Sequence, residues 1–232
     1  DTKTSFMDYS LSASIGNQFD LGGKPLGVLL TANYSRGFQY YGDGINSNYQ
    51  FTGSTLVPNF ELRDQQAVEN PEVGGLFGLS YKLSPTNEIS FLTIYSHSTD
   101  ISTRLLSGDY LLYGFVEPTS EFQSRALYFR ERELVDYIVS GDHAFQNLNN
   151  VKLEWSLSMV DSRQNEPDLR FFANNFNLQN GSYGITLAAY DPPGHFFREL
   201  DDQTVQGKVD LTIPFAQAAN KSNKFKFGGY YY

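Results

Sequence analysis

The stretch Val151-Lys152-Leu153-Glu154-Trp155-Ser156-Leu157-Ser158-Met159 alternates strictly between apolar and polar side chains. Successive side chains of a β-strand point to opposite faces of its sheet, so this alternation predicts a strand with one apolar and one polar face. Trp155, the single tryptophan of the chain, belongs to the apolar face.

The same period of two recurs on both sides of this stretch. Turn-forming residues such as Gly22-Gly23 and Asn149-Asn150 separate neighbouring runs, which is typical of β-hairpins. We expect eight strands in four hairpins, centred on the runs 7–16, 26–35, 73–83, 89–95, 125–139, 151–159, 204–213 and 225–232.

The connections between these strands alternate in length. Short turns are expected near 17–25, 84–88, 145–150 and 214–223, whereas the segments near 41–72, 98–122 and 163–202 are far longer than the usual few-residue connection. The pattern predicts an all-β, antiparallel up-and-down sheet with short turns on one side and long loops on the other.

Charge and composition exclude several classes of protein. The 232 residues hold 17 Lys and Arg against 26 Asp and Glu, a formal net charge of −9, which argues against a nucleic-acid binder. Without cysteine the chain has no disulfide, no thiolate metal site and no cysteine nucleophile. No apolar run approaches the roughly 18 to 20 residues that a membrane-spanning helix needs.

The apolar face of such strands contacts either a protein core or lipid. Soluble sheets usually carry long charged side chains on the outer face, whereas here the polar face is rich in Ser, Thr, Gly and Asn. Aromatic residues such as Tyr34, Phe91 and Tyr95 gather near the ends of the apolar runs, as in outer-membrane barrels. We therefore expect a transmembrane β-barrel segment in a bacterial outer membrane. Its water-filled side would carry Ser10, Ser12, Asn33, Lys82, Glu154, Lys208 and Asp210.

The first predicted strand leads into a short turn, and the eighth runs back toward the long-loop side. In a complete bacterial barrel both termini lie on the short-turn side. We therefore expect residues 1–232 to be a single unit, an interior part of a larger barrel, whose two unpaired edges allow edge-to-edge self-association.

Several stretches resemble the β-barrel region of TonB-dependent outer-membrane receptors of the Bacteroidetes or Chlorobi type. Each resembles a strand or turn consensus of that family rather than a chemical fingerprint. The stretches are 23–30 with Asn33-Tyr34-Ser35, 74–85, 131–143, 165–170, and 197–202 running into 207–215.

The resemblance implies a role without catalysis. Such receptors have a barrel of about 22 strands closed by a plug domain, and import scarce nutrients such as metal chelates or oligosaccharides with energy relayed by a TonB-type protein. The expected partners are outer-membrane lipid, a small-molecule solute, the plug domain and the energy-coupling protein. The plug and the energy-coupling box are not in this sequence.

The sequence holds no convincing catalytic or metal motif. His97, His143 and His195 lack metal-ligand spacing, and Asp43-Gly44 lacks the flanking acids of a calcium loop. Glu131 and Glu133 share one strand face but are better explained as a charged strand extension than as a glycosidase pair. We expect no enzyme, no cofactor and no bound metal.

The long loops combine aromatic and polar side chains, which suits capture of a sugar or chelate. The same side chains could instead only pack the loops on one another. The candidate ligand-binding residues are Tyr40, Tyr41, Tyr110, Tyr113, Phe171, Phe172, Tyr190 and His195. Two other classes stay open, namely a soluble β-sandwich or small barrel that binds carbohydrate, and a surface adhesin.

Overall fold

A computed structural model describes residues 4–110, 119–185, 193–217 and 221–232, and these form one antiparallel sheet. No helix in these ranges is long and apolar enough to span a membrane. The elements are β1 (Tyr9–Asp20), β2 (Pro25–Phe51), β3 (Leu56–Ser84), β4 (Asn87–Tyr110), β5 (Ser120–Phe145), the 3-10 turn η2 (Gln146–Leu148), β6 (Val151–Asn177), β7 (Tyr183–Gly184), β8 (Gly194–Gln217) and β9 (Lys221–Tyr231).

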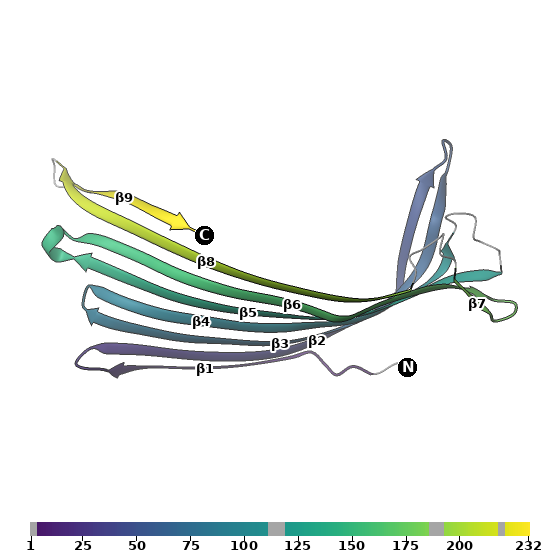
Figure 1. Cartoon of the computed structure of the whole chain (residues 1–232), viewed down its shortest axis with the longest axis horizontal. Helices are drawn as coiled ribbons and strands as arrows, with labels where there is room; N and C mark the ends of the chain where they lie inside the picture. Colours follow the sequence, from purple (N-terminus) through teal and green to yellow (C-terminus); the bar gives the residue numbers. More distant parts are fainter. Residues whose placement is uncertain (1–3, 111–118, 186–192, 218–220) are drawn as a thin grey trace.

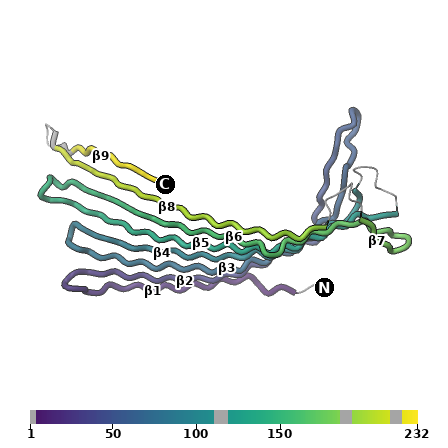
Figure 2. Tube along the Cα trace, in the orientation of Figure 1, coloured from purple at the N-terminus to yellow at the C-terminus, as the bar shows by residue number. Residues whose placement is uncertain are grey.

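Each long strand pairs with its neighbour in the chain, in the order β1-β2-β3-β4-β5-β6-β8-β9, and the two-residue β7 pairs with β6. The predicted up-and-down antiparallel architecture is therefore confirmed, with β7 added to the eight expected strands. Figures 1 and 2 show a curved sheet that does not close, with β1 and β9 at its two edges.

The β1–β2, β3–β4 and β5–β6 turns lie at one end of the sheet, called here the turn end (left in Figure 1). Gly22 and Gly23 close the β1–β2 turn at φ values of 65° and 77°, which glycine adopts without steric cost. Asn149 and Asn150 follow η2 at φ values of 54° and 61°, a region that Asn tolerates better than most residues. The predicted turns therefore contain residues that adopt the observed positive φ values easily.

The opposite end, called here the arm end, is more ordered than the sequence suggests. β2 continues to Phe51 and β3 begins at Leu56, so most of the segment 41–72 is a paired hairpin. β4 likewise runs to Tyr110, and β6 runs to Asn177. Much of what the sequence predicts as long loops is therefore strand. These residues lack a clean apolar alternation, which is the signal that detects a half-buried strand.

One hairpin leaves the general surface of the sheet at the arm end. The register of β2 and β3 shifts between Tyr41 and Gly44 and again between Asn48 and Tyr49. Such bulges bend a strand and increase its local twist. Beyond them the tip of the β2–β3 hairpin rises away from the other strands (Figure 1).

The described residues contain only a small buried apolar cluster, at the arm end. Leu62, Phe122 and Ala173 are buried there. Partly buried side chains pack around them, namely Phe60, Leu106, Tyr110 and Phe171. None of these comes from the strictly alternating runs, so the described sheet does not bury the apolar face of those runs beneath a core.

Gly108 of β4 tests the packing at this cluster. Its φ is 147°, and an added Cβ would lie 2.5 Å from the backbone oxygen of Glu61 on β3. We expect Gly108→Ala to lower the free energy of unfolding by about 1–3 kcal/mol, because backbone must move. Denaturant titration followed by circular dichroism measures this loss. Gly207→Ala on β8, where nothing lies within 4 Å, is the matched control, and an equal loss in both variants would contradict the account.

Candidate functional site

The register of the sheet brings apolar side chains from all the long strands to one face. Val28, Leu79, Phe91, Val139 and Leu157 stand opposite one another on β2 to β6. Leu157 is 53% exposed, although it lies in the middle of this row. We call this surface the apolar face. It continues over every long strand and has no protein covering it among the described residues.

The apolar side chains form a band near the turn end, called here the apolar band. On each strand it spans roughly nine residues, close to the 9 to 11 that a tilted strand needs to cross a bilayer. On the apolar face it comprises the residues within 11–19, 26–34, 73–81, 89–95, 135–145, 151–159, 205–213 and 225–231.

The band runs diagonally across the sheet because it follows the turns and not the rows of paired residues. Leu26 is one residue from the start of β2, whereas Val209, in the same cross-strand row, is eight residues from the end of β8. The turns thus shift by seven residues over five strand-to-strand steps. At about 3.3 Å per residue and about 4.8 Å per step, this corresponds to strands tilted by about 45° to the line of the turns.

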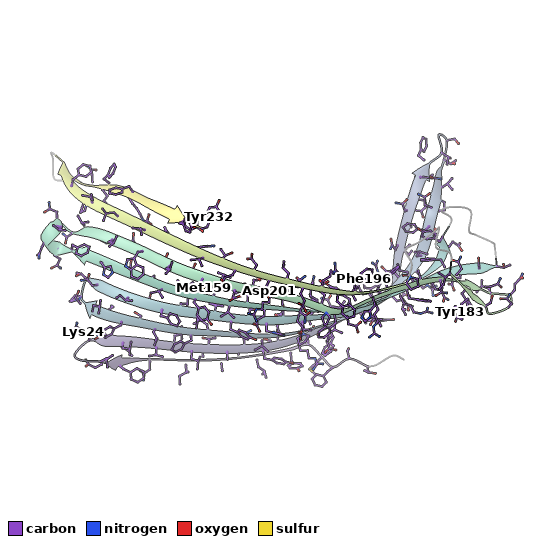
Figure 3. The ribbon with its side chains drawn as sticks, in the orientation of Figure 1. Lys24, Met159, Tyr183, Phe196, Asp201 and Tyr232 are labelled. Atoms are coloured by element: carbon purple, nitrogen blue, oxygen red, sulfur yellow. The ribbon has the colours of Figure 1, made fainter. Side chains whose placement is uncertain are left out.

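Charged side chains begin where the band ends on the arm side. His97 lies between Glu131 and Glu133, with nitrogen to oxygen distances of 4.0 and 3.9 Å. Farther across the sheet, Arg163 pairs with Asp201 at 3.5 Å. Figure 3 shows Met159, in the band, nearer the turn end than Asp201. On this face the apolar band therefore ends at a border of charged side chains.

At the turn end, Trp155 belongs to a short chain of hydrogen bonds on the apolar face. Its indole Nε1 donates to Nε2 of His143 at 3.1 Å, and Nδ1 of His143 lies 3.1 Å from Oδ1 of Asn87. The indole also covers Gly141, since a Cβ there would lie 2.4 Å from Nε1. The polar N–H of the indole is thus satisfied although the ring lies on an apolar surface.

The other surface, called here the polar face, carries all seven residues that the sequence places on a water-filled side. Near the turn end it has a row of serines, and the hydroxyls of Ser90 and Ser140 are 2.7 Å apart. The neighbouring row runs from Lys82 through Glu88, Asp142 and Glu154 to Asp210. Lys226 lies 3.2 Å from Glu154 and 3.3 Å from Asp210. Two shallow, open depressions share Asp142 and Glu154 in this row.

Two of the predicted ligand-binding residues come together at the arm end, but in a packing role. Tyr110 and Phe171 both pack on the buried cluster. The ring of Tyr110 stacks on Phe60 at 5.7 Å and on Phe122 at 4.8 Å. The sequence left open whether these side chains bind ligand or pack on one another. The observed contacts of Tyr110 and Phe171 are packing contacts.

The other predicted ligand-binding residues are dispersed. Tyr40 is 71% exposed, and the hydroxyl of Tyr41 lies within hydrogen-bond distance of Asp64 at 3.1 Å and of Gln66 at 2.9 Å. Phe172 is exposed on the face opposite to Phe171. His195 pairs with Asp168 at 2.8 Å and lies against the ring of Phe197. Tyr113 and Tyr190 lie outside the described residues.

A row of alternating charges on the polar face at the arm end was missed in the sequence. Arg130 donates to Asp100 on the neighbouring strand, and Asp100 also accepts from Asn70. On β6 the buried Glu166 accepts from the hydroxyl of Tyr128 at 2.8 Å, and its second oxygen contacts Arg198. Pro167 is a local sequence signal for an irregular strand here, because a proline donates no ladder hydrogen bond. The register shifts beside it, between Glu166 and Leu169.

Asp64 and Arg104 form a second ion pair at the arm end, in which Asp64 is buried and the Arg104 side chain is 41% exposed. Both Asp64 oxygens accept hydrogen bonds from the guanidinium, at 2.9 and 2.6 Å, and the Asp64 side chain is only 8% exposed. The hydrogen bonds from Arg104 hold the pKa of Asp64 below its ordinary value, although burial acts in the opposite direction. This pair therefore ties the base of the β2–β3 hairpin to β4.

No family model matches the chain, and neither the curated proteins nor the solved structures contain a match. Within the described residues, no group of three or more His, Asp or Glu side chains is placed to hold a metal ion. Function is therefore inferred from the geometry of the two faces and of the arm end.

The Asp64–Arg104 pair predicts a pH-dependent stability of the arm end. Because the folded-state pKa of Asp64 is lowered, the pair stabilises the fold above the ordinary value of 3.8, and this contribution is lost as pH falls through the folded-state pKa. We expect Asp64→Asn to cost about 1–3 kcal/mol at neutral pH. Urea midpoints of both proteins, compared from about pH 6 to about pH 2.5, should converge. A difference that stays constant over this range would rule the account out.

Proposed function

We propose that this chain forms part of the wall of a bacterial outer-membrane β-barrel that takes up small solutes, of the TonB-dependent receptor kind. The observation that carries the proposal is the exposed apolar band, which stays within four residues of the turn-end limit of every strand while it crosses eight strands diagonally. A slab of hydrocarbon imposes such a band on tilted strands.

Three further features support the membrane setting. The tilt of about 45° agrees with that of outer-membrane strands. Aromatic side chains such as Tyr34, Tyr81 and Tyr95 lie at the borders of the band, where interfacial aromatics gather. The short turns at one end and the extended hairpins at the other match the asymmetry of these barrels.

A soluble carbohydrate-binding sandwich fits the same residues less well. Such a domain buries one face of each sheet in a core. Here the buried apolar residues in the described ranges are Leu62, Phe122 and Ala173, all outside the band. The apolar face requires a cover, and lipid supplies one along the whole band.

The arm end is the part proposed to meet solute. It extends well past the charged border of the band and is braced by the buried cluster and by the ion pairs of Asp64 and Glu166. Tyr40 is 71% exposed on this end of the sheet. Metal chelates or oligosaccharides are the proposed solutes, with a plug domain and a TonB-type protein as further partners.

Trp155 gives a direct test of the lipid contact, because it is the only tryptophan. In vesicles that contain brominated lipid we expect its fluorescence to be quenched several-fold, since bromine quenches an indole in contact with the acyl region. The matched control carries Trp155→Phe and Ser156→Trp, which moves the indole to the adjacent position on the polar face. Equal quenching in both proteins, or none in either, would defeat the proposal.

A deletion strain tests uptake. Cells that lack the gene should lose growth when one scarce chelate or oligosaccharide is the limiting nutrient, and the intact gene should restore it. Because an uptake defect is bypassed by excess nutrient, growth should recover at high concentration. Normal growth on every scarce chelate and oligosaccharide tried would remove the support for a transport role.

A further inference from the structure

The ion pairs on the polar face at the arm end hide their carboxylates and turn their arginines toward solvent. The Glu166 side chain is 4% exposed, whereas that of its partner Arg198 is 59% exposed. Asp64 is likewise buried while Arg104 is partly exposed. Each pair is neutral as a whole, but an ion in solution approaches the guanidinium more closely, and the Coulomb energy falls with distance. This part of the polar face therefore presents positive charge, although the chain has a net charge of −9.

Asp100 lies beside two arginines, so this part of the arm end has one cation in excess. Arg130 donates to Asp100, and Arg132 lies 3.7 Å from the same carboxylate. Nε of Arg132 donates to the side-chain oxygen of Gln164 at 3.2 Å, which orients the guanidinium. The Arg132 side chain is 47% exposed, against 25% for Asp100. Among the described residues, Arg132 is therefore held in position with no carboxylate at hydrogen-bond distance.

The register of the sheet places two exposed arginines around one open position. Arg132, Gln164 and Leu200 share a cross-strand row of β5, β6 and β8. Arg198 is two residues from Leu200 on β8, so both side chains lie on the polar face. At about 4.8 Å per strand and about 3.3 Å per residue, the backbones of Arg132 and Arg198 are about 12 Å apart. We call these four residues, of which Leu200 is 61% exposed, the arginine site.

Two carboxylates border the arginine site. Glu72 lies in the row of Arg132, two strands away on β3, and accepts from Ser35 at 3.4 Å. Asp202 follows Leu200 on the same face, toward the turn end, and accepts from Thr204 at 3.3 Å. An anionic group of a solute is repelled on these two sides and attracted between the arginines. The pattern of charge therefore sets where such a group binds.

We propose that the arginine site captures solutes that carry carboxylate groups, which pair with the terminal nitrogens of Arg132 and Arg198. A guanidinium presents its donors in a planar fork that fits a carboxylate with two parallel hydrogen bonds. Carboxylate is the anion that both proposed classes of solute can carry, as a uronic acid in an oligosaccharide or as a metal ligand in a chelate. The inference rests on the proposed function, because it takes the polar face as the inside of a barrel.

The arginine site is a charged wall and not a closed pocket. The depressions that share Asp142 and Glu154 lie at the turn end and are lined by other residues. Surfaces that carry charge of one sign raise the local concentration of oppositely charged solutes and speed their association. The site is therefore suited to the first encounter with an anionic solute at the arm end.

Charge-selective cysteine labelling tests the sign of this surface, because the chain has no cysteine of its own. The reporter is Leu200→Cys in the complete protein in its native membrane. The control is Ser158→Cys, on the same face, whose cross-strand partners Ile138 and Gln206 are uncharged. Two membrane-impermeant methanethiosulfonates are compared, one with a sulfonate and one with a trimethylammonium group. We expect the ratio of anionic to cationic labelling rates to be at least fivefold higher at Leu200→Cys, and equal ratios would overturn the proposal.

Arginine variants assign the charge to the site. Added to Leu200→Cys, Arg132→Gln should lower the ratio at least twofold, whereas Arg132→Lys keeps the charge and should keep the ratio. The matched control is Arg163→Gln, which removes an exposed arginine from the apolar face of β6 and should leave the ratio unchanged. Equal effects of Arg132→Gln and Arg163→Gln would refute the assignment.

Protection by solute tests the carboxylate and distinguishes its two sources. The probes are trigalacturonate, its uncharged methyl ester and iron(III) citrate, and the thiol of Leu200→Cys is labelled with an uncharged maleimide. We expect a carboxylate probe to slow labelling and the ester not to, and both Arg132→Gln and Arg132→Lys to require at least fivefold more probe. Protection by trigalacturonate identifies an acidic oligosaccharide, and protection by iron(III) citrate identifies a chelate. Equal protection by acid and ester, or none by either carboxylate probe, would overturn the carboxylate class.

Leu157→Cys separates this proposal from the membrane assignment. It lies on the apolar face, so lipid should protect it from both impermeant reagents whether or not the arginine site binds solute. Rapid labelling at Leu157→Cys would refute the membrane setting. Equal charge ratios at Leu200→Cys and Ser158→Cys, with Leu157→Cys protected, would refute only the arginine site.

Discussion

Backbone pairing is the constraint on which the rest of the structure depends. Each N–H and C=O in a hydrocarbon slab needs a partner within the protein, so neighbouring strands must pair without interruption through it. The register that satisfies this demand also decides which side chains share a face. It places Val28 and Leu157 in one row on the apolar face, although β2 and β6 are distant in sequence.

The two ends of the sheet differ in side-chain polarity and in the regularity of strand pairing. Between the turn end and the charged border, one face is apolar and pairing is nearly regular. Beyond that border the strands carry polar side chains on both faces and rely on ion pairs such as Asp64–Arg104 and Asp100–Arg130. Bulges appear there as well, because the register no longer has to present an unbroken apolar surface.

Period-two alternation predicted the eight long strands, their four hairpins and the side on which Trp155 lies. It could not predict the arm end, because strands that are polar on both faces do not differ in pattern from loops. The burial of Glu166 and of Oδ1 of Asp136 depends on neighbouring strands that are distant in sequence. The sequence could not show that Tyr110 and Phe171 pack on one buried cluster while Tyr40 stays exposed, because those contacts join different strands.

The tilt of the strands in a bilayer tests the central claim most directly. Polarised infrared spectroscopy of the protein in oriented lipid films measures the angle between the strands and the membrane normal from the amide I dichroism. If the apolar band lies in hydrocarbon, its diagonal course requires a mean tilt of about 35–45°. Strands without preferred orientation, or a protein that stays out of the lipid film, would contradict the account.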